Sequence, residues 1–227
     1  MRFSLPTTTL GRAFGLTPDR GTPLDILVGV GIGAVAMFGI FGTEWALRAI
    51  TVEGLGGFSR EWYLWFLALV VMAGLEELLS RCFVIQGLMV LLKGRKWVAV
   101  GISAALFGFA HAASPDASVI SVIGNALGGV VYAVAFLGTG ALWMSWGLHF
   151  SWNFFQGQVL GFPVSGLTLP GLVAQTAPGP EWLTGAAYGP EAGAVGIAFR
   201  FVVIALLFGW LKHRRAAASW KDVLLLR

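Results

Sequence analysis

The chain has 227 residues, of which 57% are apolar and only 11% are charged. Soluble domains are roughly 45–50% apolar and about 25% charged, so this composition excludes an ordinary soluble protein and predicts an integral membrane protein. The net charge of +4 comes mostly from tails and short loops, which fits orientation in a membrane and gives no indication of nucleic-acid binding. A single cysteine, Cys82, excludes an internal disulfide.

The first part of the chain predicts a tail followed by two apolar segments. Residues 1–23 form a polar tail without the apolar run of a cleavable signal peptide. The first span is expected at 24–42, where Gly29 and Gly33 form a Gly-xxx-Gly pattern that favours close helix packing. The second apolar stretch, 61–92, is too long for one straight span, so we expect it to be tilted, kinked, or broken near Gly74 or Gly87.

Four further apolar stretches predict the rest of a helical bundle. They cover residues 97–112, 117–137, 141–160 and 192–211, and a basic tail follows at 212–227. The Gly/Pro-rich residues 161–190 are expected to form a loop or a re-entrant piece. The predicted fold is therefore all-α, with about six transmembrane helices around a polar intramembrane cavity and one membrane domain over residues 24–211.

Charges between the predicted spans indicate an orientation. Three basic clusters lie in the N-terminal tail, after the second stretch and after the last one, whereas Asp116, Glu181 and Glu191 fall in the alternate connections. Cytoplasmic loops carry an excess of lysine and arginine, so both termini are expected to be cytoplasmic.

Ionisable residues inside the apolar stretches indicate a functional site. Residues 74–82 read GLEELLSRC and place Glu76, Glu77 and Arg81 within the second stretch, while His111 and His149 each lie in a later one. Such groups cost at least a few kcal/mol each at the centre of a bilayer and are therefore usually functional. Five of them on three predicted helices indicate one shared polar site.

Helical spacing suggests different roles for these groups. Glu77 and Arg81 are four residues apart, so they can pair on one helix face and leave Glu76 as a candidate general base. Asn153 follows His149 by four residues and shares its face, and Phe107 precedes His111 by the same spacing. Structural readings also exist: a buried ion pair can hold helices together, a single histidine can bond a backbone carbonyl, and Phe107 can simply pack.

The order of these motifs resembles a known family. Glu76-Glu77-x-x-x-Arg81, Phe107-x-x-x-His111 and His149-x-x-x-Asn153, on separate spans, are similar to the signature of the CPBP family (CAAX protease and bacteriocin-processing, or Abi), which includes the type II CAAX prenyl proteases. The resemblance covers about residues 62–166, and includes the segment GFPVSG at 161–166. It implies an intramembrane endopeptidase with a water-accessible cavity.

The resemblance also implies roles for the motif residues. Glu76 would activate water, His111 would help to hold that water, and His149 and Asn153 would donate hydrogen bonds to the tetrahedral oxyanion. Glu77, Arg81 and Phe107 would support this group. Zinc is the one cofactor to consider, with Glu76, His111 and His149 as its candidate ligands, because one carboxylate and two imidazoles form a plausible catalytic set. We favour a mechanism without metal, because no His-Glu-x-x-His motif is present.

Two other functions stay open at this point. A proton-coupled transporter also uses buried glutamate and histidine residues, although no internal repeat is apparent in the spacing of the spans. A non-proteolytic scaffold or immunity protein of the same family would keep the motif residues for stability. The expected partners are the lipid bilayer and a protein or peptide substrate, prenylated or otherwise membrane-associated, and the expected location is the inner (plasma) membrane of a bacterial cell.

Overall fold

The computed structural model describes residue 11 and residues 14–214. Most of the predicted polar tail (1–23) and nearly all of the basic tail (212–227) lie outside the described residues. The long helical segments, in chain order, are α2 (Thr22–Ala46), α3 (Arg60–Glu77), η1 (Leu78–Ile85), α4 (Gln86–Leu91), α5 (Lys96–Ala110), α6 (Val119–Thr139), α7 (Leu142–Asn153), η3 (Phe154–Val159) and α9 (Ala194–Arg214). Shorter elements are β1 (Thr51–Leu55), η2 (His111–Ala113), β2 (Val173–Thr176), α8 (Glu181–Thr184), η4 (Ala186–Tyr188) and η5 (Pro190–Ala192).

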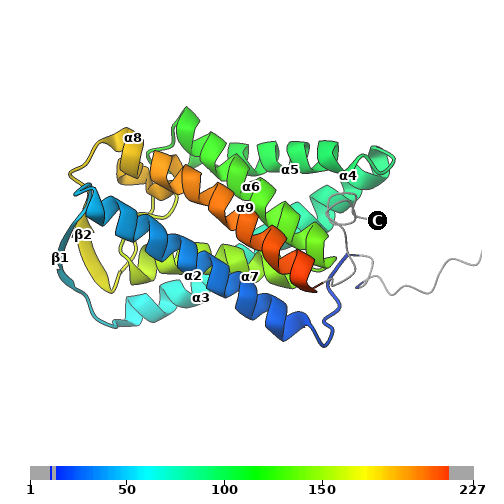
Figure 1. The fold of residues 1–227 in the computed structure, drawn as a ribbon, viewed down its shortest axis with the longest axis horizontal. Helices are drawn as coiled ribbons and strands as arrows, with labels where there is room; N and C mark the ends of the chain where they lie inside the picture. The colour runs from blue at the N-terminus through cyan, green and yellow to red at the C-terminus, as the bar shows by residue number, and fades with distance from the viewer. Residues whose placement is uncertain (1–10, 12–13, 215–227) are drawn as a thin grey trace, which may run out of the picture.

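The long helices run lengthwise through the molecule, and the connections gather at its two ends (Figure 1). One end holds β1, β2 and α8, and the other holds the turn between α4 and α5. Basic Lys93 and Arg95 lie in that turn, whereas Asp116 and Glu181 belong to connections at the opposite end. This separation agrees with the predicted alternation of charge, while the orientation of the termini across a membrane stays a prediction.

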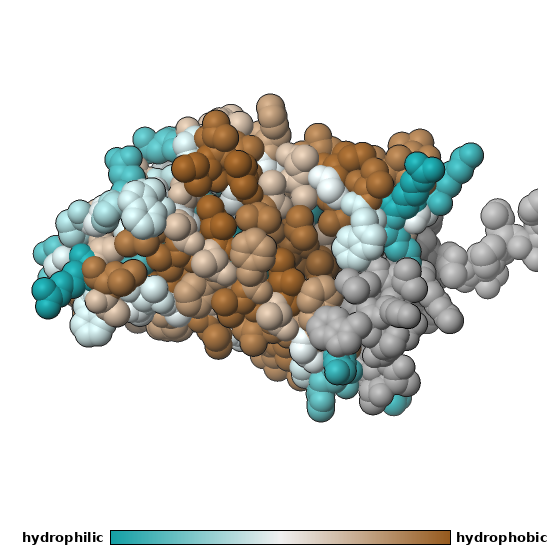
Figure 2. All heavy atoms as spheres, turned by 45° about the horizontal axis from the view of Figure 1, so that its top comes forward, coloured by the Kyte–Doolittle hydropathy of each residue, from teal (hydrophilic) through white to brown (hydrophobic). Residues whose placement is uncertain are grey.

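The surface has the hydrophobic belt of a membrane protein. Figure 2 shows apolar residues covering the middle of the visible face and hydrophilic ones near its ends. Large apolar side chains such as Leu27, Leu67 and Phe201 are more than half exposed, which is explained if they face lipid. Four helices among the described residues are long and apolar enough to cross a membrane, namely Thr22–Ala46, Lys96–Ala113, Val119–Thr139 and Ala194–His213. The predicted count of six is therefore not confirmed.

The second apolar stretch is one continuous helical run from α3 through η1 to α4. Of the alternatives predicted for this stretch, a break near Gly74 or Gly87 does not occur, and the run instead contains a π-helical segment over Leu78–Ile85. A second π-helical segment, η3, follows directly after Asn153. Segments of this kind are rare and often occur at functional sites. Here η1 begins directly after Glu77 and η3 directly after Asn153.

Glycines bring α2 and α7 into close contact. A Cβ on Gly29 would lie 2.6 Å from the carbonyl oxygen of Met144, and one on Gly33 would lie 2.7 Å from Oγ of Ser151. Both positions therefore need glycine for the backbones to approach, as the Gly-xxx-Gly pattern predicts. The Ser151 hydroxyl also donates a hydrogen bond of 2.7 Å to the carbonyl of Val30.

The all-α prediction is wrong in one respect, because β1 and β2 form a two-stranded antiparallel sheet. β2 lies in the Gly/Pro-rich segment 161–190, which also contains α8 and η4.

Glu191, which directly follows that segment, is buried and only 2% exposed. Burial raises the pKa of this carboxyl, while the nearby Arg200 and Gln156 act in the opposite direction. Glu191 lies in a connection, as predicted, and it is a buried group there.

Candidate active site

A cavity of about 440 Å³ lies between α3 and α5 and contains the predicted motif residues Glu76, His111 and Asn153. The loop at 164–169 closes one side of it. The other lining side chains are mostly apolar, among them Trp65, Leu69, Met72, Leu79, Val84, Leu106 and Phe107. A few polar groups therefore converge in an apolar space, which is the usual character of a binding or active site.

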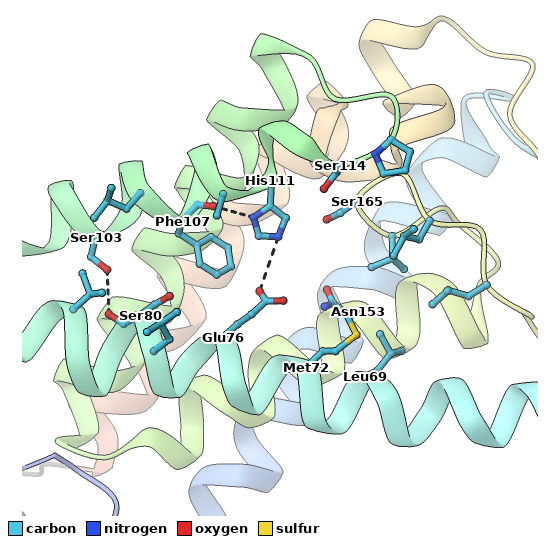
Figure 3. Close-up of a pocket in the computed structure, with 18 of the residues that line it drawn as sticks. Leu69, Met72, Glu76, Ser80, Ser103, Phe107, His111, Ser114, Asn153 and Ser165 are labelled. Carbon is cyan, nitrogen blue, oxygen red and sulfur yellow. Dashed lines mark hydrogen bonds and ion pairs between the residues drawn. The ribbon is translucent and has the colours of Figure 1, made fainter.

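Glu76 occupies the centre of this polar group (Figure 3). Its side chain is 35% exposed, but its Oε2 atom is buried and accepts no hydrogen bond. Oε2 lies 3.9 Å from Nε2 of His111 and 3.8 Å from Nε2 of His149. Both distances exceed hydrogen-bond length, and a polar contact of this length is often bridged by water. Both imidazoles thus face one oxygen of Glu76 across a short gap.

His111 is oriented by the end of its own helix. It follows the last residue of α5, and its Nδ1 lies 2.8 Å from the carbonyl oxygen of Phe107. A carbonyl only accepts, so Nδ1 carries the hydrogen and, in the neutral ring, Nε2 presents a lone pair. The Phe107 ring lies 4.8 Å from the imidazole, between centroids. The spacing of four residues therefore sets the tautomer and direction of His111.

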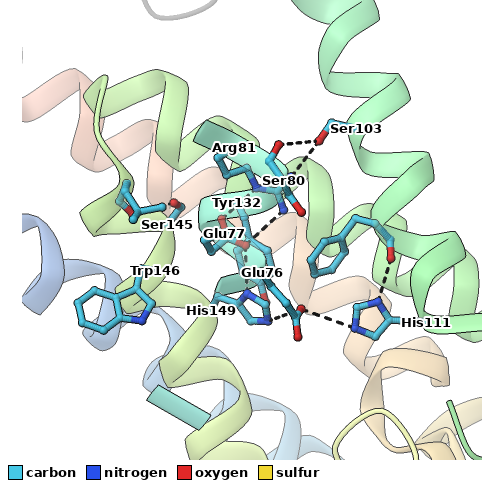
Figure 4. A network of polar contacts seen from close by, with 12 residues as sticks. Glu76, Glu77, Ser80, Arg81, Ser103, His111, Tyr132, Ser145, Trp146 and His149 are labelled. Atoms are coloured by element: carbon cyan, nitrogen blue, oxygen red, sulfur yellow. Dashed lines mark hydrogen bonds and ion pairs between the residues drawn. The ribbon is translucent and has the colours of Figure 1, made fainter. Parts of the chain in front are cut away.

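His149 is held from two sides in the bundle. Its Nδ1 lies 3.0 Å from Oε1 of Glu77, and its ring stacks on Tyr132 with centroids 4.5 Å apart and an interplanar angle of 15°. The side chain is almost fully buried, and Figure 4 shows it on the opposite side of the Glu76 carboxylate from His111. The Glu77 carboxylate fixes the hydrogen on Nδ1, so Nε2 faces Glu76.

Glu77 and Arg81 form the ion pair predicted from their spacing (Figure 4). Nε of Arg81 donates to Oε2 of Glu77 at 2.9 Å, Nη2 donates to Oε1 at 3.3 Å, and both side chains are fully buried. Nη1 of Arg81 reaches Oγ of Ser103 on α5 at 3.3 Å. The contact between Glu77 and His149, across 72 residues of sequence, was not predicted. Glu77 therefore connects the buried pair to a histidine of the site.

Two residues behind His149 were missed by the sequence analysis. Arg200 of α9 is only 2% exposed, lies over the ring of Trp152 at 3.5 Å from its centroid, and donates to the Tyr132 hydroxyl at 3.2 Å. Tyr132 in turn stacks on His149. A signal for Arg200 was present, because an arginine inside an apolar span is usually functional. Tyr132 gave no comparable signal, since tyrosine is common in membrane helices.

The residues can be tested for their fit to a metal ion. Glu76, His111 and His149 offer one carboxylate and two imidazoles, and each imidazole directs Nδ1 to an acceptor, as metal-bound histidines do. Within the part of the chain that the structure describes, no group of three or more His, Cys, Asp and Glu side chains is arranged to hold a metal ion. The donor atoms of Glu76, His111 and His149 are of the types that zinc binds, but their spacing does not fit a zinc ion. We therefore derive no catalytic step through a metal.

One comparison with known proteins gave a match. Residues 58–155 match the family described as type II CAAX prenyl endopeptidase, Rce1-like. The segment includes Glu76, Glu77, Arg81, Phe107, His111, His149 and Asn153, and it confirms the resemblance stated from the motifs. Neither the search of curated proteins nor that of solved structures gave a match. Arg200 and the loop at 164–169 lie outside the matched residues.

Proposed function

Because residues 58–155 belong to the type II CAAX prenyl endopeptidase family, we propose that this protein is an intramembrane endopeptidase that uses water activated by Glu76. The observation that carries the proposal is the placement of the Glu76 carboxylate opposite two imidazole Nε2 atoms, at 3.8 and 3.9 Å, at a mostly apolar cavity. Its substrates are proteins or peptides in the membrane, with prenylated proteins as the class that the family name suggests.

The proposed membrane arrangement supports this activity. We place all six helical stretches across the bilayer, including α3 to α4 and α7 with η3, which carry the site. Both termini then lie in the cytoplasm, and the membrane is the plasma membrane of a bacterial cell. Exposed apolar residues Met72, Leu79 and Leu106 line the cavity and would meet lipid, so a membrane-bound substrate could approach from the side.

The first chemical step is the activation of water. A water in the gap between Glu76 and His111 can donate one hydrogen to the carboxylate and the other to the Nε2 lone pair of His111. Its oxygen then keeps a lone pair for attack on a peptide carbonyl carbon. Glu76 accepts the proton as the bond forms and can return it to the leaving amine, which is the usual course of general acid–base catalysis.

The second requirement is stabilisation of the oxyanion on the attacked carbonyl. Asn153 reaches the cavity and donates from its amide at any pH. His149 can donate from Nε2 only when doubly protonated, because Glu77 already occupies Nδ1. Asn153 is therefore the more direct donor in this arrangement, and a single such donor is worth about 10² to 10³ in turnover.

The decisive experiment compares membrane proteomes. Cells producing the wild type are expected to contain at least one peptide fragment that cells producing Glu76→Ala lack. An equally expressed Glu61→Ala variant is the matched control, because Glu61 is an exposed carboxylate on the same helix. A transporter or a non-proteolytic scaffold would give no such fragment, and identical proteomes from wild type and Glu76→Ala would overturn the proposal.

Metal dependence gives a separate prediction. If Glu76 acts on water directly, the purified protein is expected to keep its activity in a strong chelator and to contain less than one bound metal per chain by elemental analysis. Asn153→Ala should then slow turnover by about 10² to 10³, and His149→Ala should leave the metal content unchanged. Chelator-sensitive activity that zinc alone restores would instead assign Glu76, His111 and His149 as ligands.

A further inference from the structure

The loop that closes the cavity contains a strained turn. Val164 and Leu167 exchange two backbone hydrogen bonds of 2.9 Å, and the residues between them have positive φ angles, +47° for Ser165 and +83° for Gly166. This pattern is that of a type I′ turn, which favours Asn-Gly or Gly-Gly. Serine is an unfavourable residue at the first of these positions, and strain of this kind is frequently kept at functional sites.

The turn is held firmly in place. A Cβ on Gly166 would lie 2.0 Å from the carbonyl oxygen of Pro115, so only glycine lets the turn approach the loop after α5. The Gly166 amide also donates to the carbonyl of Tyr188 at 2.9 Å. Gln156 donates to the carbonyl of Pro163 at 2.5 Å and to Glu191 at 2.6 Å. These contacts determine the path of the backbone, and the Ser165 side chain itself interacts with Tyr188 and Glu191.

Ser165 presents its hydroxyl to the cavity. Its side chain lines the same space as Glu76, His111 and Asn153, and Figure 3 shows it beside Ser114 on the side toward His111. Its Oγ lies 3.5 Å from Oε1 of Glu191, a long contact in which the carboxylate can only accept. When Ser165 donates to Glu191, its hydrogen points away from the cavity and an Oγ lone pair remains for a ligand.

We propose that Ser165 is a substrate-binding residue whose Oγ accepts a hydrogen bond from a main-chain N–H of the bound peptide. A donor is favoured over an anion because Glu76 lies in the same cavity, Glu191 lies behind Ser165, and no lysine or arginine among the described residues lines this space. Each residue of an extended peptide except proline offers such an N–H. This inference rests on the proposed protease activity and specifies how the same site holds its substrate.

Two substitutions of Ser165 separate binding from folding. Ser165→Gly removes the hydroxyl and relieves the backbone strain, whereas Ser165→Ala removes the hydroxyl and keeps the strain. Both are expected to raise KM about 3- to 10-fold with little change in kcat, the factor for one neutral hydrogen bond. The melting temperature should stay equal or rise for the glycine variant and should not rise for the alanine variant. Thr168→Ala removes an exposed hydroxyl from the same loop and should change neither constant.

The assay uses a quenched fluorescent peptide that spans the cleavage site found in the proteome comparison. Main-chain N-methylation is introduced at each residue around that site, one at a time. At one position N-methylation should raise KM for the wild type and have no additional effect on Ser165→Gly, because the same hydrogen bond is already lost.

Specific outcomes would overturn this assignment. The assignment fails if KM is unchanged in both serine variants, or if the change in KM follows the melting temperature. It also fails if the rise in KM of the serine variants disappears when the peptide carries a C-terminal amide, because the ligand of Ser165 would then be the peptide carboxylate. The proposed function fails separately, through a wild type that releases no fragment. A wild type that cleaves, with Glu76→Gln inactive and Ser165→Gly normal, removes only the inference about Ser165.

Discussion

Glu76→Gln is expected to lower turnover by about 10² to 10⁴, the contribution of a positioned general base. The amide keeps the shape of the side chain but cannot take a proton from water. The buried Oε2 atom accepts no hydrogen bond in the structure, so the substitution breaks no hydrogen bond there and the folded yield should not change. Cleavage of the quenched peptide in detergent micelles measures the loss, and the melting temperature measures the fold.

Glu61→Gln is the matched control, because it makes the same chemical change at an exposed position on α3. It should leave both turnover and melting temperature unchanged. An active Glu76→Gln enzyme would show that Glu76 is not the base, and an inactive Glu77→Gln protein with normal stability would transfer that role to Glu77.

Glu77→Gln is expected to impair both folding and catalysis. It removes the negative partner of the fully buried Arg81, and breaking a buried ion pair in this way costs about 3–5 kcal/mol. The amide has one accepting and one donating end. If its oxygen receives Nε of Arg81, its nitrogen faces Nδ1 of His149, where both groups are donors. Melting temperature and turnover should therefore fall together.

The double variant Glu77→Gln/Arg81→Met separates these two effects. Replacing the unpaired cation with an apolar side chain should recover much of the lost stability. Turnover should stay low, because His149 still lacks its carboxylate acceptor. A double variant that recovers stability and activity to the same extent would show that Glu77 has no role beyond its pair with Arg81.

The helical stretches were largely predictable from local sequence. The apolar runs at 24–42, 97–112, 117–137, 141–160 and 192–211 correspond closely to α2, α5, α6, α7 with η3, and α9. Hydrophobicity over about 20 residues is a local property, so it can be read without knowing what packs against the helix. The π-helical winding after Glu77 and the sheet between β1 and β2 could not be predicted in this way, since both depend on contacts between distant segments.

The same distinction applies to the site. Spacing along one helix predicted the pair of Glu77 with Arg81 and the contact of His111 with the residue four positions before it, because i and i+4 side chains are neighbours on any helix. It could not predict that Glu77 also bonds His149, 72 residues away.

The sequence by itself determined a membrane-type helical protein, a match of residues 58–155 to a protease family, and a set of polar residues that had to share a site because lipid tolerates them poorly. Only the tertiary structure decided which atoms face each other. The packing of α3, α5 and α7 brings both imidazole Nε2 atoms within 4 Å of one Glu76 oxygen. The fold also places Ser165 in the same cavity and Arg200 against Tyr132, which stacks on His149, and both residues lie outside the matched segment. Such distances depend on how helices cross, and no local pattern of residues encodes a crossing.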